Sequence, residues 1–292
     1  MTDPDRRRGV VLVMVLWSIA LLSALAMAAS VSFRGFAGIA AIGRDRVQGE
    51  ALFTAGLEVA ASMVASSAPF TELETIVNLS TGAVRARLSD EGGRIDVGKA
   101  PAEVLAALLR SVGAPEAQAN DAAQRIVQWR NRNNSAPPGA TAPASNTLAK
   151  SLGTDTGQPF ADVLEIAQVP GVAPQWVAAM APLTTVFGAQ TVNPLTAPAA
   201  VIAALPGVDR VQLASFLAAR RASPADERIG ATLGPAQRFL ATKREQVVGV
   251  ELAETLPDGY AAAARAVMVL MPQDSQPYRI LVWTPLPPST LR

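Results

Sequence analysis

Apolar residues fill one long run near the start of the chain. Val10 to Phe33 is 24 residues long and contains no charged side chain. As a helix it would be about 36 Å long, enough to cross a hydrocarbon core of roughly 30 Å. Arg6, Arg7 and Arg8 precede it directly, and basic residues tend to stay on the cytoplasmic side. The pattern therefore predicts a single-pass membrane helix with a cytoplasmic N-terminus and the bulk of the chain on the other side, which in a bacterial inner membrane is the periplasm.

Helical periodicity returns between Arg44 and Ser66. Apolar residues three and four apart form one face of this segment: Leu52, Phe53, Leu57, Ala60, Ala61 and Val64. Gly35, Gly38 and Gly43 separate the two helical stretches and allow a bend or fraying there. We therefore predict a long N-terminal helix whose first half lies in lipid and whose second half packs on a globular domain.

The next part of the chain combines short strands with a block of helices. Val84–Leu88 alternates apolar and basic residues, and Arg94–Val97 is a second extended piece. Apolar residues at helical spacing follow in six segments: 101–112, 116–130, 160–168, 174–183, 198–205 and 210–221. Residues 131–159 are rich in Asn, Ser, Thr, Pro and Gly, which predicts a loop or a disordered insertion.

Period-two alternation marks the end of the chain. It covers Val247–Ala253, Ala263–Met271 and Tyr278–Thr284, and short turns connect these segments. Three such strands in succession predict an antiparallel meander. Because strands precede and follow the helices, the helical block is predicted to be inserted into a sheet domain of the α+β class.

An internal repeat lies within the helical block. Residues 95–108 align without gaps on residues 192–205, and seven of the fourteen positions are identical. This indicates a duplicated helical unit. Each copy has an Ala-Pro step where its helix is expected to start, because proline is well tolerated in a first helical turn.

The second copy resembles helix-hairpin-helix modules that bind DNA, since the turn Leu205-Pro206-Gly207-Val208 follows its helix. Such modules use a second glycine so that backbone amides can approach a phosphate. Here Asp209 occupies that position, and its carboxylate would repel a phosphate although it suits a helix N-cap. Arg210, Arg220 and Arg221 are too few for a strong phosphate footprint. A structural duplication is favoured, and a membrane-anchored DNA-binding or DNA-uptake protein is the alternative.

Composition limits the possible chemistry. The formal net charge of +1 gives no electrostatic case for nucleic acid, and the chain contains neither cysteine nor histidine. This excludes disulfides, thiolate nucleophiles, serine-histidine triads and zinc sites built on His or Cys. Carboxylates remain, but Glu251 and Glu254 are spaced for a strand surface. We therefore expect a protein that is not an enzyme, with no catalytic residue, metal or cofactor.

A glycine, Gly9, stands where the basic residues meet the apolar run. A secretory signal peptide has an apolar region of about 7 to 15 residues, which is shorter than this one. A plain membrane anchor gives no reason for the glycine. The arrangement resembles the leader of type IV pilin-like proteins, in which a prepilin peptidase cuts after the glycine and the new N-terminus is methylated.

Several segments in this order resemble one family, the K component of bacterial type II secretion systems, a minor pseudopilin. The segments are RGVVLVMVLW (8–17), DEGGRIDV (90–97), KAP (99–101), IVQWR (126–130), VPGV (169–172), VNP (192–194) and TAP (196–198). The resemblance implies a pilin-like fold, a long N-terminal helix on an antiparallel sheet with a large inserted helical domain. The implied parts are a cleaved leader (1–9), a transmembrane and assembly helix (10–33), the rest of that helix with the first strands (34–97), the inserted domain (98–235, with 131–159 as its loop) and the last strands (236–292).

The resemblance also implies a role and specific residues. The role is at the tip of the periplasmic pseudopilus, where the protein would initiate or cap assembly with the I and J minor pseudopilins and the major pseudopilin. Further implied partners are the prepilin peptidase, the inner-membrane secretion platform and the membrane, and no nucleic acid. Gly9 would precede the cleaved bond and Val10 would be methylated. Met14 occupies the position where major pilins carry a glutamate, whose absence is characteristic of the K component.

One family feature is weaker here. Relatives often carry several acids after the position of Trp129, and some bind calcium. In this chain the segment Arg130–Asn134 has no carboxylate and two arginines, whereas calcium needs several negatively charged oxygen ligands. We predict no calcium site there, and we expect Asp90, Glu91 and Asp96 to cap turns at strand ends.

Overall fold

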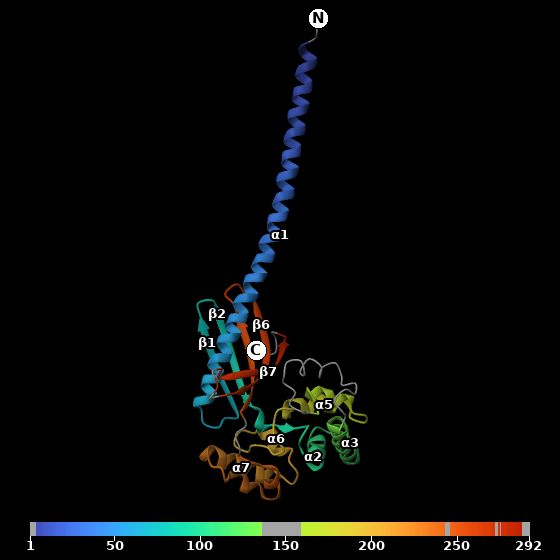
Figure 1. Ribbon diagram of the computed structural model, residues 1–292, viewed down its shortest axis with the longest axis vertical. Coiled ribbons are helices and arrows are strands. Elements are labelled where there is room, and N and C mark those ends of the chain that lie inside the picture. Colours follow the sequence, from blue (N-terminus) through green and yellow to red (C-terminus); the bar gives the residue numbers. More distant parts are fainter. Residues whose placement is uncertain (1–3, 136–158, 243–245, 272–273, 275, 288–292) are drawn as a thin grey trace.

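The computed structural model describes residues 4–135, 159–242, 246–271, 274 and 276–287. Side chains at 4–12, 29, 31–38 and 133–135 lie outside this description. The chain forms a projecting helix, an antiparallel sheet and a helical domain (Figure 1). This is the predicted α+β fold class.

The first helix, α1 (Pro4–Ser66), is continuous over 63 residues. It projects from the rest of the chain as a rod, and only its last part lies against the sheet (Figure 1). It passes through Gly35, Gly38 and Gly43 without interruption. A glycine costs only about 1 kcal/mol relative to alanine in a helix, so the expected bend or fraying does not break the hydrogen-bonded ladder.

One five-stranded antiparallel sheet supports α1. Its strands are β1 (Glu72–Leu79), β2 (Gly82–Asp90), β5 (Val247–Thr255), β6 (Ala261–Leu270) and β7 (Tyr278–Leu286). They lie in the order β1-β2-β5-β6-β7, and every neighbouring pair is antiparallel. The predicted meander is confirmed as β5, β6 and β7, and Val84–Leu88 lies within β2. Strand β1 was not predicted.

The second half of α1 packs on one face of this sheet. Five of the six residues of the predicted face are buried, Leu52, Leu57, Ala60, Ala61 and Val64, and Phe53 is partly buried against the same core. They meet Val84, Ala86, Leu88, Val248, Val250, Leu252, Ala266 and Met268 of the strands. Gly56 lets the helix approach closely, because a Cβ there would lie 2.9 Å from Leu252 Cδ2. The sheet and α1 therefore share one hydrophobic core.

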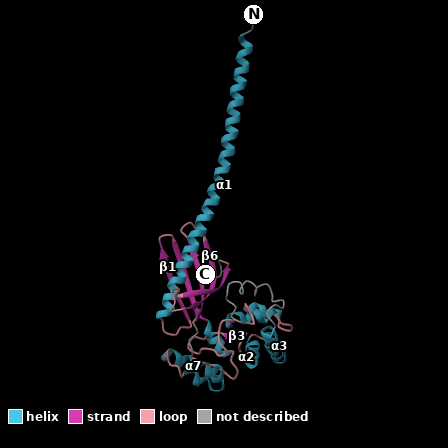
Figure 2. Ribbon diagram, in the orientation of Figure 1, coloured by secondary structure: helices cyan, strands magenta, loops and turns pink. Residues whose placement is uncertain are grey.

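The helical domain is inserted between β2 and β5, which are neighbours in the sheet. Its helices gather at the end of the sheet that lies away from the free end of α1 (Figure 2). It contains α2 (Ala102–Ser111), α3 (Glu116–Ser135), α5 (Pro174–Met180), α6 (Ala199–Ala203) and α7 (Arg210–Ala222). Four 3-10 helices accompany them, η1 (Glu91–Gly93), η2 (Val163–Gln168), η3 (Ala181–Leu183) and η4 (Ile229–Phe239). Two short strands, β3 (Ile95–Asp96) and β4 (Thr184–Thr185), pair in parallel.

Three details of this domain differ from the sequence-based expectation. Residues 131–135 continue α3 rather than starting a loop, and residues 136–158 lie outside the described part of the chain. Residues 163–168 form a 3-10 helix instead of an α-helix, because Pro170 follows within one turn and stops a longer helix. Helix η4 was not predicted, since Gly234 and Pro235 interrupt its apolar pattern.

The internal repeat extends further than the aligned residues. In the first unit, β3 pairs in parallel with β4, which follows α2, α3, η2, α5 and η3. In the second unit, Val192 forms a parallel bridge to Leu240, which follows α6, α7 and η4. Ile95 and Val192 are equivalent positions in the alignment. Each unit therefore starts with an extended residue, passes through a helical hairpin and returns beside its own start.

Candidate assembly site

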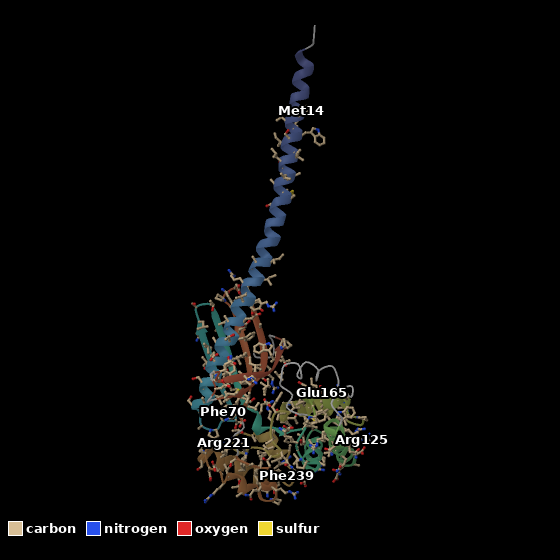
Figure 3. The ribbon with its side chains drawn as sticks, in the orientation of Figure 1. Met14, Phe70, Arg125, Glu165, Arg221 and Phe239 are labelled. Carbon is tan, nitrogen blue, oxygen red and sulfur yellow. The ribbon has the colours of Figure 1, made fainter. Side chains whose placement is uncertain are left out.

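The exposed part of α1 is the first candidate site. Met14 is 66% exposed and Trp17 is 74% exposed. Figure 3 shows Met14 far out on the rod, well away from the labelled residues of the globular part. The Met14 carbonyl accepts a hydrogen bond from Ser18 Oγ at 2.8 Å. This stretch of helix thus presents apolar side chains that nothing in the described chain covers.

Two predicted processing residues, Gly9 and Val10, fall within α1, and their side-chain surroundings lie outside the described residues. In the described part of the chain, no helix is both long and apolar enough to span a membrane. Of the predicted span 10–33, side chains are described at 13–28 and at 30.

Glu254 marks the place where α1 reaches the sheet. Its side chain belongs to the face of β5 that α1 covers, and the residue is only 2% exposed. Burial raises the pKa of Glu254 to about 7, and the negative charge of Glu50 adds to the shift. Glu251 lies an odd number of residues away and so points to the opposite face of the sheet. The two carboxyl groups therefore do not form a pair for acid–base chemistry.

A buried ion cluster joins the sheet to the helical domain. Glu91 follows β2 directly, is 1% exposed, and its Oε1 lies 3.2 Å from Nη2 of Arg265 on β6. Arg94 Nη1 lies 3.9 Å from the same oxygen. Gly249 of β5 leaves space for this carboxylate, since a Cβ there would overlap Glu91 Oε1. Three segments far apart in sequence are thereby held together.

The second repeat unit packs on the segment next to Glu91. Asn193 N–H donates to the carbonyl of Gly92 at 2.8 Å. A Cβ at Gly93 would lie 2.8 Å from the backbone of Thr196, so only glycine permits this contact. The segment Asp90–Gly93 therefore fixes how the helical domain sits on the sheet.

The expected turn-capping role of the acidic residues is confirmed for two of them. Asp90 Oδ1 accepts from Gly92 N–H at 2.9 Å, and Asp96 Oδ1 accepts from Gly98 N–H at 2.8 Å. Burial raises the pKa of Asp96, while the positive charge of Lys99 and the Gly98 N–H oppose the shift. Glu91 has a different role, because it takes part in the ion cluster described above.

The helix-hairpin-helix resemblance has a structural explanation. Asp209 is the N-cap of α7, where its carboxylate accepts from Gln212 N–H at 2.7 Å in a complete capping box. Arg220 donates to the carbonyl oxygens of Pro194 and Ala197 at 3.0 and 2.6 Å. One of the three arginines considered for phosphate binding is therefore occupied inside the fold, and a carboxylate stands at the helix start where a phosphate would bind.

The segment considered for calcium also has a defined structure. Arg130–Asn134 belongs to α3, and Arg130 Nη1 donates to the carbonyl of Ala100 at 2.7 Å. Within the described ranges, no group of three or more Asp, Glu, His or Cys residues is placed to hold a metal ion.

Sequence reasoning missed three interactions at these sites. They are the Glu91–Arg265 ion pair, the contact of Glu254 with α1, and the two arginines that donate to equivalent carbonyls, Arg130 to Ala100 and Arg220 to Ala197. Of these three, only the arginine contacts could have been anticipated from the sequence, since the alignment of the repeat places Ala100 and Ala197 at equivalent positions.

Comparisons with known proteins agree with this architecture. Residues 76–189 match the family model described as type II secretion system (T2SS), protein K. Among solved structures, the chain is similar to a chain of the GspK-GspI-GspJ complex from enterotoxigenic Escherichia coli, Type 2 Secretion System, with a TM-score of 0.53. The identity is 16%, over 84% of this chain and 96% of that chain. A search of curated proteins found no match.

The family match covers β2, the segment Asp90–Gly93 and the first repeat unit, and the structural likeness covers 84% of the chain. The family match agrees with the family that the sequence resembles, and the structural likeness agrees with the expected fold. Residues 76–189 thus match the type II secretion system protein K family, and the chain shares its fold with a chain of a GspK-GspI-GspJ complex.

Proposed function

We propose that the protein works at the tip of the periplasmic pseudopilus and initiates or caps its assembly, so that folded proteins are exported across the outer membrane. The observation that carries this proposal is the rod of α1, which exposes apolar residues such as Met14, Trp17 and Leu21. Exposed apolar surface of this extent needs lipid or protein to cover it. We propose the inner membrane as the cover before assembly, and neighbouring pseudopilin helices as the cover afterwards.

The proposed partners follow from the family and from the related complex. The solved relative is part of a complex that contains GspI and GspJ, and we infer that the I and J minor pseudopilins are partners here. The major pseudopilin, the prepilin peptidase and the inner-membrane platform complete the proposed set. We propose a structural rather than a catalytic role, which is consistent with Glu251 and Glu254 lying on opposite faces of the sheet.

Met14 supports the tip position. Within the apolar run from Val10 to Phe33 the chain carries no acid. A carboxylate at mid-bilayer costs about 2.5–3.5 kcal/mol, so it is retained only where a partner uses it. A subunit with no predecessor in the pseudopilus has no N-terminus to neutralise, which fits methionine at this position.

Processing provides the test of the proposed function. When the full chain is produced together with a prepilin peptidase, intact-mass spectrometry should show loss of residues 1–9 and addition of one methyl group at Val10. Gly9→Ala should remain unprocessed, because the peptidase needs the glycine before the cut. Gly38→Ala is the matched control and should be processed normally.

The same preparations test the tip assignment. Processed protein should co-purify from detergent-solubilised membranes with the I and J minor pseudopilins, and unprocessed Gly9→Ala should not. Efficient processing of Gly9→Ala would overturn the cleavage site, and processed protein that binds neither I nor J would overturn the position at the tip.

A further inference from the structure

Glu254 is a carboxyl group buried directly under α1. Along α1, exposed residues predominate up to Gln48, and Gly49 is the first buried residue in its described part. A Cβ on Gly49 would overlap Glu254 Oε1. The carboxyl group therefore lies against the helix backbone at the point where the rod leaves the globular part, and glycine makes this approach possible.

No cation neutralises this group among the described residues. Glu254 takes part in none of the ion pairs found there, and its Oε2 is buried without a hydrogen-bond partner. On the sheet, its neighbours in register are Val84 of β2 and Ala262 of β6, which carry no charge.

The charged residues near Glu254 on the surrounding elements form ion pairs with other residues. On α1, Arg46 pairs with Glu50 at 3.1 Å, and both are largely exposed. Arg44 pairs with Asp45 at 3.2 Å and with Asp258, in the turn after β5, at 3.5 Å. Glu50 is the acid that acts on Glu254 through its charge. The local field therefore opposes ionisation of Glu254 and offers no compensation for it.

We propose that Glu254 is a proton-dependent latch between α1 and the sheet, which fixes where the rod leaves the globular part. In the protonated form the carboxyl group lies under Gly49 at little cost. In the ionised form it must be hydrated, because a buried charge without a partner is strongly unfavourable. Hydration requires the first buried turns of α1, residues 45–56, to separate from β5.

The direction of the pH dependence follows from linkage. The folded pKa of Glu254, about 7, lies above the unfolded value of 4.5. The stabilising contribution of the protonated group is fully present below 4.5 and is lost as pH rises through about 7. The latch is thus closed in mildly acidic conditions and weakened in mildly alkaline ones.

Hydrogen exchange of the full chain in detergent micelles tests this latch. Amides of residues 45–56 are compared at about pH 5.5 and about pH 8.5 after correction for intrinsic exchange rates, and their protection should fall by roughly 10- to 30-fold at the higher pH. Glu254→Gln is neutral and nearly the same size, so its protection should be independent of pH. Glu251→Gln, on the opposite face of β5, is the control and should behave like the wild type.

Two results would overturn the proposal. One is wild-type protection of residues 45–56 that changes less than about twofold across this pH range. The other is the same pH dependence in Glu254→Gln as in the wild type, which would assign the effect to another group. Amides of β6 serve as an internal reference in every sample, because a general loss of stability would change them equally.

Discussion

The two repeat units of the helical domain stabilise the same turn with different side chains. In the first unit Asp96 accepts from the N–H two residues ahead at 2.8 Å, and in the second unit Asn193 does so at 3.1 Å. The backbone carbonyls of both residues accept again from Ala100 and Ala197, at 2.8 and 2.9 Å. Both residues are buried, at 1% and 3% exposure. The turn therefore needs a side-chain oxygen, and it does not need a charge.

The difference lies in what each unit requires around that oxygen. Asp96 is accompanied by Lys99, whose Nζ lies 3.5 Å from Asp96 Oδ2 and donates to the Gly188 carbonyl at 2.6 Å. The neutral Asn193 has Thr196 in the place of that lysine. The first unit thus carries a titratable pair, and the second achieves the same turn without one.

For the arginines it is the second unit that has the larger number of contacts. Arg130 donates to one carbonyl, that of Ala100, whereas Arg220 donates to two, those of Pro194 and Ala197. Arg220 also lies over the ring of buried Phe216, with 5.2 Å from its Cζ to the ring centroid. The second unit, which has the shorter helices, depends more on its arginine.

The largest expected loss of stability comes from removing these arginines, and it should differ between the two units. Arg220→Ala should lower the free energy of unfolding by roughly 3 kcal/mol, because two carbonyls lose their donor, and Arg130→Ala by about 1.5 kcal/mol. Urea unfolding of the full chain in micelles, followed by circular dichroism, measures both. Equal losses would show that the second carbonyl contact contributes nothing.

A smaller effect is expected when the second unit is given the charge of the first. Asn193→Asp places a carboxylate in the buried turn without a lysine, so it should lower the free energy of unfolding by about 2 kcal/mol near neutral pH. The loss should shrink as pH falls and the carboxyl group becomes protonated. The same unfolding experiment, repeated at several pH values, checks this, and a loss independent of pH would point to a packing defect instead.

The smallest effect is expected for the reverse exchange, Asp96→Asn. Replacing a buried ion pair by a neutral isostere is often close to neutral, so stability near neutral pH should change by less than about 1 kcal/mol. Because burial raises the pKa of Asp96 above 3.8, its protonated form stabilises the fold at low pH, and this contribution is lost as pH rises through the raised value.

The stability difference between Asp96→Asn and the wild type should therefore vary with pH in the acidic range and become constant above it. Comparing the two proteins removes the contribution of Glu254, which both contain. A difference that stays constant over the whole acidic range would contradict the raised pKa of Asp96.

Patterns of neighbouring residues were enough to predict much of this molecule. The alternation in 247–253, 263–271 and 278–284 predicted three strands correctly, because a sheet with one covered face needs this period. The aligned copies 95–108 and 192–205 predicted a duplication, and Asp209 was correctly expected to cap a helix. Strand β1 was missed because its charged residues Glu72 and Glu74 face solvent at a sheet edge and dilute the apolar pattern.

The sequence by itself thus determined most of the elements, their order and the turn chemistry, since each depends on residues a few positions apart. Only the tertiary structure decided that Glu91 pairs with Arg265, that Glu254 lies under Gly49, and that Arg220 is used inside the fold. Glu91 and Arg265 are 174 positions apart, and no local pattern specifies such a partner. The burial and the partners of these carboxyl groups depend on how α1, the sheet and the inserted domain pack together. That packing involves the whole chain, so it cannot be derived from local patterns.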